Sequence, residues 1–335
     1  EVIESRCFSN CLKLKKIECG SELKSISSQA FSDCSLLLSF TTSSLNYSID
    51  FESFQRCNSL QKFDFSGCCE IQHGAFDHCT SLFEIDLSKS KISSLPYNAF
   101  SDCSSLHDIT FKSDLEYIGE MCFYNCINIT SLHFSSLKYI HSNAFEFCIG
   151  LKTVTFENQP LVISSNAFHS CVSLETIELK NSEPNSNSII ENRAFENCTS
   201  LKSFQFDKWS ISSIGELAFH GCPLSHKLKF KGSSVSTNFT IFDHAFSSSL
   251  IQSVDFRFDF TSLILSNESF VECSDIKCVM IDSKHKNAIS EVFKKKIMNG
   301  RHCPNYLHTH IVVLVVIILS VLAVVILIAI IIIIC

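Results

Sequence analysis

Apolar residues recur along most of the chain with a period of about 23 residues, which is typical of a repeat protein. The stretch I-S-S-N-A-F-H-S-C-V-S-L-E-T-I-E-L, which begins at Ile163, is one copy. In each copy an aliphatic residue lies five positions before a Phe, a small residue directly precedes the Phe, and Cys follows three positions later, except at Ser249. The twelve aligned residues are Phe8, Phe31, Phe54, Phe76, Phe100, Phe123, Phe145, Phe168, Phe195, Phe219, Phe246 and Phe270.

This pattern predicts a solenoid in which each repeat forms one coil. A single coil cannot bury its apolar side alone, so stacked coils must share a continuous core. Stacking in register places Phe on Phe and Leu on Leu. The small residue before each Phe fits a crowded turn, where a larger side chain would clash with the next coil.

The end of each period predicts a β-strand. In the stretch from Leu174 to Leu179, Ile177 and Leu179 point to one face, while Thr176 and Glu178 point to the other. The strands run in the same direction in every coil, so we expect a parallel sheet. The predicted solenoid comprises residues 1–283, in about twelve coils.

The outward positions of these strands are the candidate partner-binding residues, because the concave face of a solenoid is its extended binding surface. The alternative is a face that is merely solvated. The candidates from the middle coils are Glu84, Asp86, Asp108, Thr110, His133, Thr153, Thr155, Thr176, Glu178, Ser203 and Gln205.

The motif L-x-x-L/I-x-L/F, followed by a turn and A-F-x-x-C-x-x-L, resembles the leucine-rich repeat of the BspA-like type over residues 3–282. Proteins of this type occur on the surfaces of oral bacteria and mucosal protozoan parasites. The resemblance implies a curved, right-handed solenoid with the parallel sheet on its concave side. It also implies attachment to host proteins or to other cells.

The net charge of −7 hides an asymmetry. Residues 284–301 hold six basic residues and one acid, so the chain totals of 27 and 34 leave 21 basic and 33 acidic residues before them, a net of −12. Nucleic-acid phosphates require Lys and Arg, so this acidic solenoid argues against a nucleic-acid partner.

Of the nineteen cysteines, eleven occupy the repeat position three residues after Phe. Adjacent coils bring such residues near disulfide distance, but equivalent side chains pointing the same way favour buried free thiols. No metal-ligand spacing supports zinc. We place Cys278 on the outward side of its strand. The repeat cysteines are Cys11, Cys34, Cys57, Cys79, Cys103, Cys126, Cys148, Cys171, Cys198, Cys222 and Cys273.

The sequence offers no nucleotide-binding, zinc-protease or hydrolase motif, so we expect neither an enzyme nor a cofactor. Several histidines lie near the repeat Phe, and we interpret them as surface or turn residues rather than ligands: His73, His78, His141, His169, His220 and His244.

The C-terminal part changes character. Residues 284–310 are interpreted as a cap for the solenoid or as a basic stalk beside the membrane. Residues 311–334 are uncharged and apolar except for Ser320, which predicts a transmembrane helix. The basic residues before it favour a cytoplasmic solenoid, whereas the family resemblance implies an extracellular one. A cleaved lipid-anchor signal is a third possibility. The chain begins at Glu1 within a repeat, so we expect a fragment or a processed form.

The leading functional hypothesis is a membrane-anchored adhesin or surface antigen that binds a protein, or a glycan, on host or neighbouring cells. The alternative is a tail-anchored intracellular scaffold for protein–protein interaction. A hydrolase on a repeat scaffold is the third hypothesis, and no acid–base or nucleophile pair supports it. The N-glycosylation motif occurs at Asn46, Asn128, Asn238 and Asn267, and also at Asn197, which precedes a buried Cys and is a poor acceptor.

Overall fold

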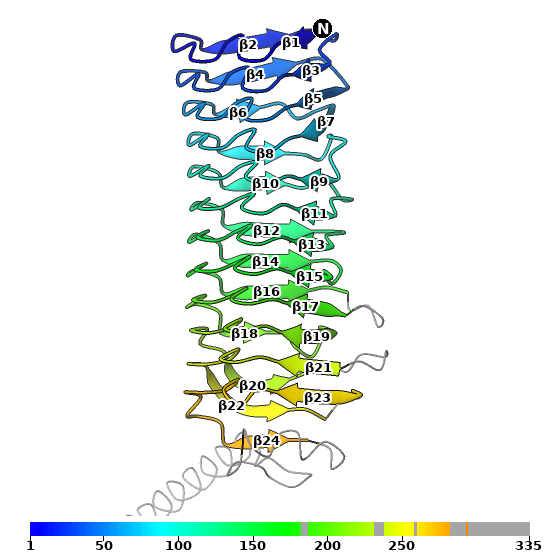
Figure 1. Ribbon diagram of the computed structural model, residues 1–335, viewed down its shortest axis with the longest axis vertical. Helices are drawn as coiled ribbons and strands as arrows, with labels where there is room; N and C mark the ends of the chain where they lie inside the picture. Colours follow the sequence, from blue (N-terminus) through cyan, green and yellow to red (C-terminus); the bar gives the residue numbers. More distant parts are fainter. Residues whose placement is uncertain (182–186, 231–237, 258–259, 282–292, 294–335) are drawn as a thin grey trace, which may run out of the picture.

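The computed structural model describes residues 1–181, 187–230, 238–257 and 260–281, together with Phe293. It shows a solenoid of short strands and turns whose coils stack along the long axis of the molecule (Figure 1). In this view the column is nearly straight, so the concave curvature implied by the family resemblance stays a prediction.

Among the described residues there is no helix long and apolar enough to cross a membrane. The predicted membrane span at 311–334 lies outside them, as does the predicted cap or stalk at 284–310 apart from Phe293.

The strands form two rows, and every strand pair in both rows is parallel. The even row contains the predicted strands and is divided into four short sheets. Its members are β2 (Lys16–Cys19), β4 (Ser39–Thr42), β6 (Lys62–Phe63), β8 (Glu84–Asp86), β10 (Asp108–Thr110), β12 (Ser131–Phe134), β14 (Thr153–Phe156), β16 (Thr176–Leu179), β18 (Ser203–Phe204), β20 (Ser225–Lys229), β22 (Leu250–Asp255) and β24 (Cys278–Met280).

The odd row was not predicted. It is built around the aliphatic residue five positions before each Phe, and it divides into a four-stranded and an eight-stranded sheet. Its members are β1 (Val2–Ile3), β3 (Ser25–Ile26), β5 (Tyr47–Ile49), β7 (Cys68–Ile71), β9 (Ser94–Leu95), β11 (Tyr117–Ile118), β13 (Tyr139–Ile140), β15 (Val162–Ile163), β17 (Ser188–Ile190), β19 (Ile211–Ile214), β21 (Asn238–Ile241) and β23 (Ser262–Leu265).

The twelve repeat phenylalanines form one continuous stack, as predicted. Consecutive rings lie between 5.0 and 5.5 Å apart and are nearly parallel. At the end of the stack, Phe293 is buried and lies 5.3 Å from Phe270. The small residue before each Phe is fully buried from Ala30 onward, which leaves no room for a larger side chain. Its carbonyl accepts the amide of the Phe in the preceding coil, as in Phe145 to Ala167 at 2.8 Å.

The repeat cysteines from Cys34 to Cys222 are free and buried, which confirms the prediction of packed thiols for them, whereas Cys11 is free but only partly buried. Each thiol from Cys34 onward donates to the carbonyl of the Phe in the preceding coil, for example Cys148 to Phe123 at 3.2 Å. The hydroxyl of Ser249, which replaces Cys in the eleventh coil, is buried and has no hydrogen-bond partner. The prediction for Cys278 was wrong: this residue is buried and disulfide-bonded.

The turn around each Phe from Phe8 to Phe246 has two residues with left-handed backbone, two positions before and two positions after the ring, whereas Phe270 has only the second, Glu272. Asn98 and Asp102 flank Phe100 in this way, with φ of +57° and +56°. Asn, Asp and Gly adopt this conformation at little cost, so their recurrence at these positions is explained by the turn. Leu217, at φ +57°, is a residue for which the conformation is unfavourable.

Candidate binding surfaces

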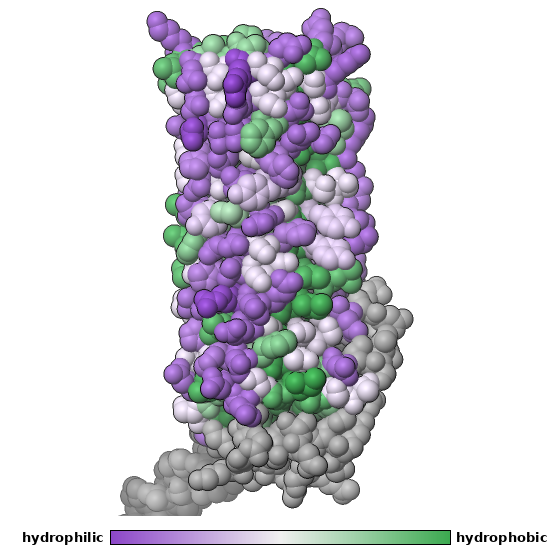
Figure 2. All heavy atoms as spheres, in the orientation of Figure 1, coloured by the Kyte–Doolittle hydropathy of each residue, from purple (hydrophilic) through white to green (hydrophobic). Residues whose placement is uncertain are grey.

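The structure brings most of the predicted contact residues together on the outside of the even row. Glu84 pairs in register with Asp108, and Asp86 with Thr110. Further along, Thr153 lies between Ser131 and Thr176. Hydrophilic side chains predominate over β8 to β18 (Figure 2). The alternating burial of β12 and β14, with every second residue inside, has the predicted phase.

Gln205 departs from the predicted arrangement. The strand β18 ends at Phe204, so Gln205 lies beyond it in a turn. Its side chain is half-buried, and its Oε1 atom is shielded from solvent without a hydrogen-bond partner. Ser203, two residues earlier, is exposed on the strand as predicted.

Many charges on the even row are paired within the solenoid. Lys62 lies 3.3 Å from Glu84, and Lys180 lies 2.8 Å from Glu178. The hydrogen bond from Lys180 lowers the pKa of Glu178. Hydrogen bonds from the side chain and backbone of Ser88 likewise lower the pKa of Asp86. These carboxylates therefore remain ionised at neutral pH and give the surface a fixed acidic character.

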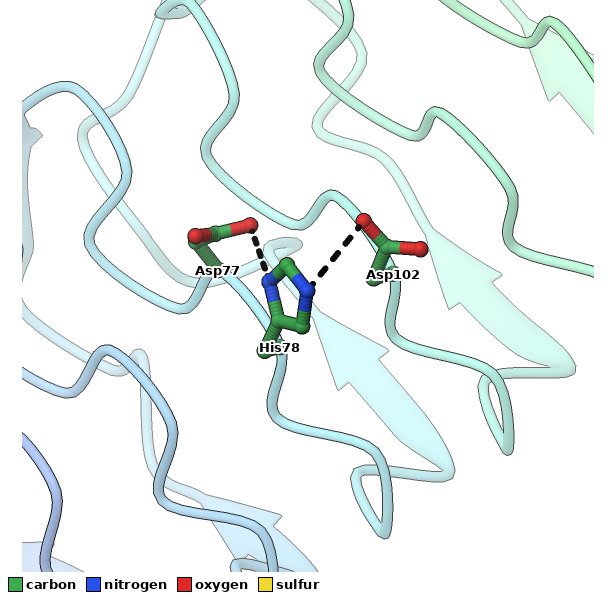
Figure 3. Close-up of side chains that lie close together, drawn as sticks. All are labelled: Asp77, His78 and Asp102. Atoms are coloured by element: carbon green, nitrogen blue, oxygen red, sulfur yellow. Dashed lines mark hydrogen bonds and ion pairs between the residues drawn. The ribbon is translucent and has the colours of Figure 1, made fainter.

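A second group of polar side chains lies in the turns after the repeat Phe. His78 lies between two carboxylates of adjacent coils: its Nδ1 atom is 2.8 Å from Asp77 and its Nε2 atom is 3.7 Å from Asp102 (Figure 3). A similar arrangement occurs four coils later, where His169 lies between carboxylates of the preceding and following coils, 2.8 Å from Glu146 and 3.7 Å from Glu196.

Ligand atoms of Asp77, His78 and Asp102 lie within 4.8 Å of one another, a spacing compatible with a metal ion. Each carboxylate is already engaged by protein groups, since Gln55 donates to Asp77 at 3.0 Å and Asn125 donates to Asp102 at 2.7 Å. The contacts join neighbouring coils, so their immediate effect is to link the stack. These histidines lie in turns, as predicted, but their carboxylate partners were not predicted.

The glycosylation candidates Asn46, Asn128, Asn238 and Asn267 are exposed. The amide of Asn128 donates to the carbonyl of Ser104 at 2.8 Å. Asn197 is half-buried and has left-handed backbone beside the buried Cys198, in keeping with its prediction as a poor acceptor.

The two parallel strand rows, the stacked Phe and the repeat period together define a leucine-rich repeat solenoid. The model of the BspA type leucine-rich repeat region matches residues 1–90, 69–183 and 162–299. The chain therefore belongs to the BspA-type leucine-rich repeat family.

Solved structures with similarity to this chain are leucine-rich repeat proteins of bacteria. A leucine rich cell surface protein from Faecalibacterium prausnitzii is 19% identical, with 87% of this chain and 86% of that chain covered and a TM-score of 0.39. A leucine-rich repeat protein from Bacteroides ovatus is 17% identical over 89% and 86%, with a TM-score of 0.44. The pneumococcal vaccine antigen PcpA is 18% identical over 88% and 82%, with a TM-score of 0.42. Among curated proteins, none matches the sequence.

Proposed function

We propose that this protein is a membrane-anchored surface protein, an adhesin or surface antigen, that binds a protein partner through the even row. The observation that carries the proposal is the contrast between inward and outward positions. The inward residues repeat from coil to coil, whereas the outward ones change from acidic at Glu84 and Asp108 to hydroxyl-bearing at Thr153 and Thr176. A repeat fold does not require this variation, and extended binding surfaces of solenoids use it.

The chemistry of the row indicates the kind of partner. Glu84, Asp86 and Asp108 would attract Lys and Arg of a protein surface and guide its approach. The hydroxyl groups of Thr153, Thr155 and Thr176 supply hydrogen bonds farther along the column, where a glycan hydroxyl is an equally suitable ligand. The predicted contact surface therefore extends across about six coils from Glu84 to Ser203, while Gln205 contributes at its buried edge.

Residues 311–334 supply the anchor in this proposal, with the solenoid outside the cell and 284–310 as a cap or stalk. The contact of Phe293 with Phe270 supports the cap, because it covers the last ring of the Phe stack. The alternative is a tail-anchored intracellular scaffold with the same binding face. The basic residues Lys294–Lys296 and Arg301 favour that orientation.

Antibody staining of intact cells that express the full chain tests the orientation. We expect staining without permeabilisation, together with a loss of mass after glycosidase treatment that becomes smaller in an Asn238→Gln variant. Staining only after permeabilisation would refute the surface protein and support the scaffold.

The binding face is tested separately by adhesion of the same cells to host cells. The double variant Glu84→Lys and Asp108→Lys should reduce adhesion at least tenfold at low salt. A control variant on the odd row, Ser94→Lys, should leave adhesion unchanged. Equal loss in both variants would show that the even row is not the contact face.

A further inference from the structure

Four consecutive strands of the odd row carry apolar side chains at their outward position. Tyr117, Tyr139, Val162 and Ile189 pair in direct register along β11, β13, β15 and β17, and we call them the apolar row. The rings of Tyr117 and Tyr139 stack 5.1 Å apart at an angle of 2°. Tyr117 is 39% exposed and Ile189 is 40% exposed, so the side chains at both ends of the row are open to solvent.

The apolar row has defined ends. Its register partners beyond the two ends are Ser94 on β9 and Ser213 on β19. Pale and green side chains gather over β11 to β17 (Figure 2). Outward positions of a solvated sheet are usually polar, and a contiguous exposed apolar group indicates an interaction site. The fold does not require it, because Ser occupies the same position in other coils.

We propose that the apolar row is the contact between two copies of this chain, packed face to face with their stacks antiparallel. A two-fold axis across the stack, between β13 and β15, brings Tyr117 opposite Ile189 and Tyr139 opposite Val162. Each aromatic ring then meets a branched aliphatic side chain. Such self-complementarity of one surface is the requirement for a two-fold symmetric dimer.

The charges beside the apolar row are compatible with this orientation. Glu116 and Lys138, which form an ion pair with each other, come opposite Ser188 and Leu161 of the second copy. Glu191 comes opposite Gly119. Every charged residue beside the row therefore faces an uncharged position, and no like charges meet.

A parallel arrangement, with the two-fold axis along the stack, is less favourable. It packs Tyr117 on Tyr117 and Ile189 on Ile189, so that rings meet rings and aliphatic side chains meet aliphatic side chains. Only the antiparallel arrangement pairs each ring with a branched aliphatic side chain, and this pairing favours the antiparallel dimer.

The contact is small. At a strand spacing of about 4.8 Å the apolar row is about 14 Å long, and stable interfaces usually bury about 800 Å² per partner. We therefore expect a weak dimer that forms at high local concentration. Its existence does not depend on the proposed binding role of the even row, and its antiparallel geometry suits molecules anchored in facing membranes.

Analytical ultracentrifugation of the full chain in detergent tests the dimer. We expect concentration-dependent dimerisation, and the double variant Tyr117→Ser and Ile189→Ser should weaken it at least tenfold while thermal unfolding stays unchanged. The control variant His133→Ser, exposed on the even row, should dimerise normally. A chain that stays monomeric at every concentration, or a control that dissociates equally, would overturn the proposal.

Cross-linking tests the orientation with the same protein in a Cys7→Ser background, which removes an exposed thiol. A mixture of Tyr117→Cys and Ile189→Cys chains should form a covalent dimer with a short bis-maleimide, and neither variant alone should. Efficient cross-linking of the Tyr117→Cys variant with itself would place the stacks parallel and overturn the antiparallel dimer.

Discussion

The even and odd rows are built in the same way, yet their outward positions differ. Both are parallel ladders that cover one core, and the Phe stack lies behind both. The outside of the even row carries carboxylates, lysines and hydroxyls, with ion pairs such as Lys62 to Glu84. The outside of the odd row carries serines near the N-terminus and the apolar row in its middle coils. Because the same coils carry both faces, stacking alone cannot explain the difference, and the two proposed surface roles rest on it.

Alkaline pH should have the largest effect, because it destabilises the coils that carry both faces. Burial raises the pKa of eight repeat thiols above the ordinary value of 9.0, to about 11 for Cys34 and to about 12 for Cys148. Between pH 9 and these values the unfolded chain releases protons that the folded chain retains. Each such thiol therefore lowers the free energy of unfolding by about 1.4 kcal/mol per pH unit as the pH rises, while below pH 9 its contribution is fully present.

Urea unfolding from pH 8 to 11 measures this loss. Circular dichroism should show a steep fall in the free energy of unfolding above pH 9. In a Cys148→Ala variant this fall should be shallower by about 1.4 kcal/mol per pH unit, the contribution of one thiol proton. An equal slope in both proteins would mean that the thiols are not the titrating groups.

A core substitution should also damage both faces, but only locally. Phe168→Ala should cost about 3–5 kcal/mol, because it leaves a cavity between Phe145 and Phe195. Since each coil contacts only its neighbours, amide exchange should rise in both β14–β18 and β13–β17. Thr176→Ala, on the exposed surface of the same coils, is the control and should change little. A similar rise in exchange near Phe31 would contradict the linear stack.

The sequence was sufficient to predict the coils but not the second face. The period specified the Phe stack, the buried thiols and the even row, because their apolar positions alternate over several residues. Most strands of the odd row are two or three residues long, too short for an alternating pattern, and only the recurring aliphatic before Phe marked their place. The carboxylate partners of His78 and His169 could not be predicted either, because each histidine contacts a carboxylate more than twenty residues away in the sequence.

The eleventh coil allows a test, with a smaller expected effect, of the thiol hydrogen bonds that link neighbouring coils. Ser249 is the natural exception among the repeat cysteines, and its buried hydroxyl lacks a partner. The longer C–S bond of a Ser249→Cys variant should let the thiol reach the carbonyl of Phe219, as its counterparts do, and raise the free energy of unfolding by about 1 kcal/mol. The reverse change, Cys148→Ser, should lower it by about 1–3 kcal/mol. Equal stability of Ser and Cys at both positions in chemical denaturation would show that the thiol hydrogen bond is unimportant.

The smallest expected effect is on stability at the even row itself. Lys62 and Glu84 are both well exposed, so a Lys62→Ala variant should change the free energy of unfolding by less than about 1 kcal/mol, and salt should reduce even that difference. The same substitution leaves Glu84 unpaired and makes the row more acidic. If the row binds a basic partner, cell adhesion should strengthen at low salt while stability stays constant. A large loss of stability with unchanged adhesion would instead make the charges of the even row part of the framework, and the contrast between the two faces would lose its functional meaning.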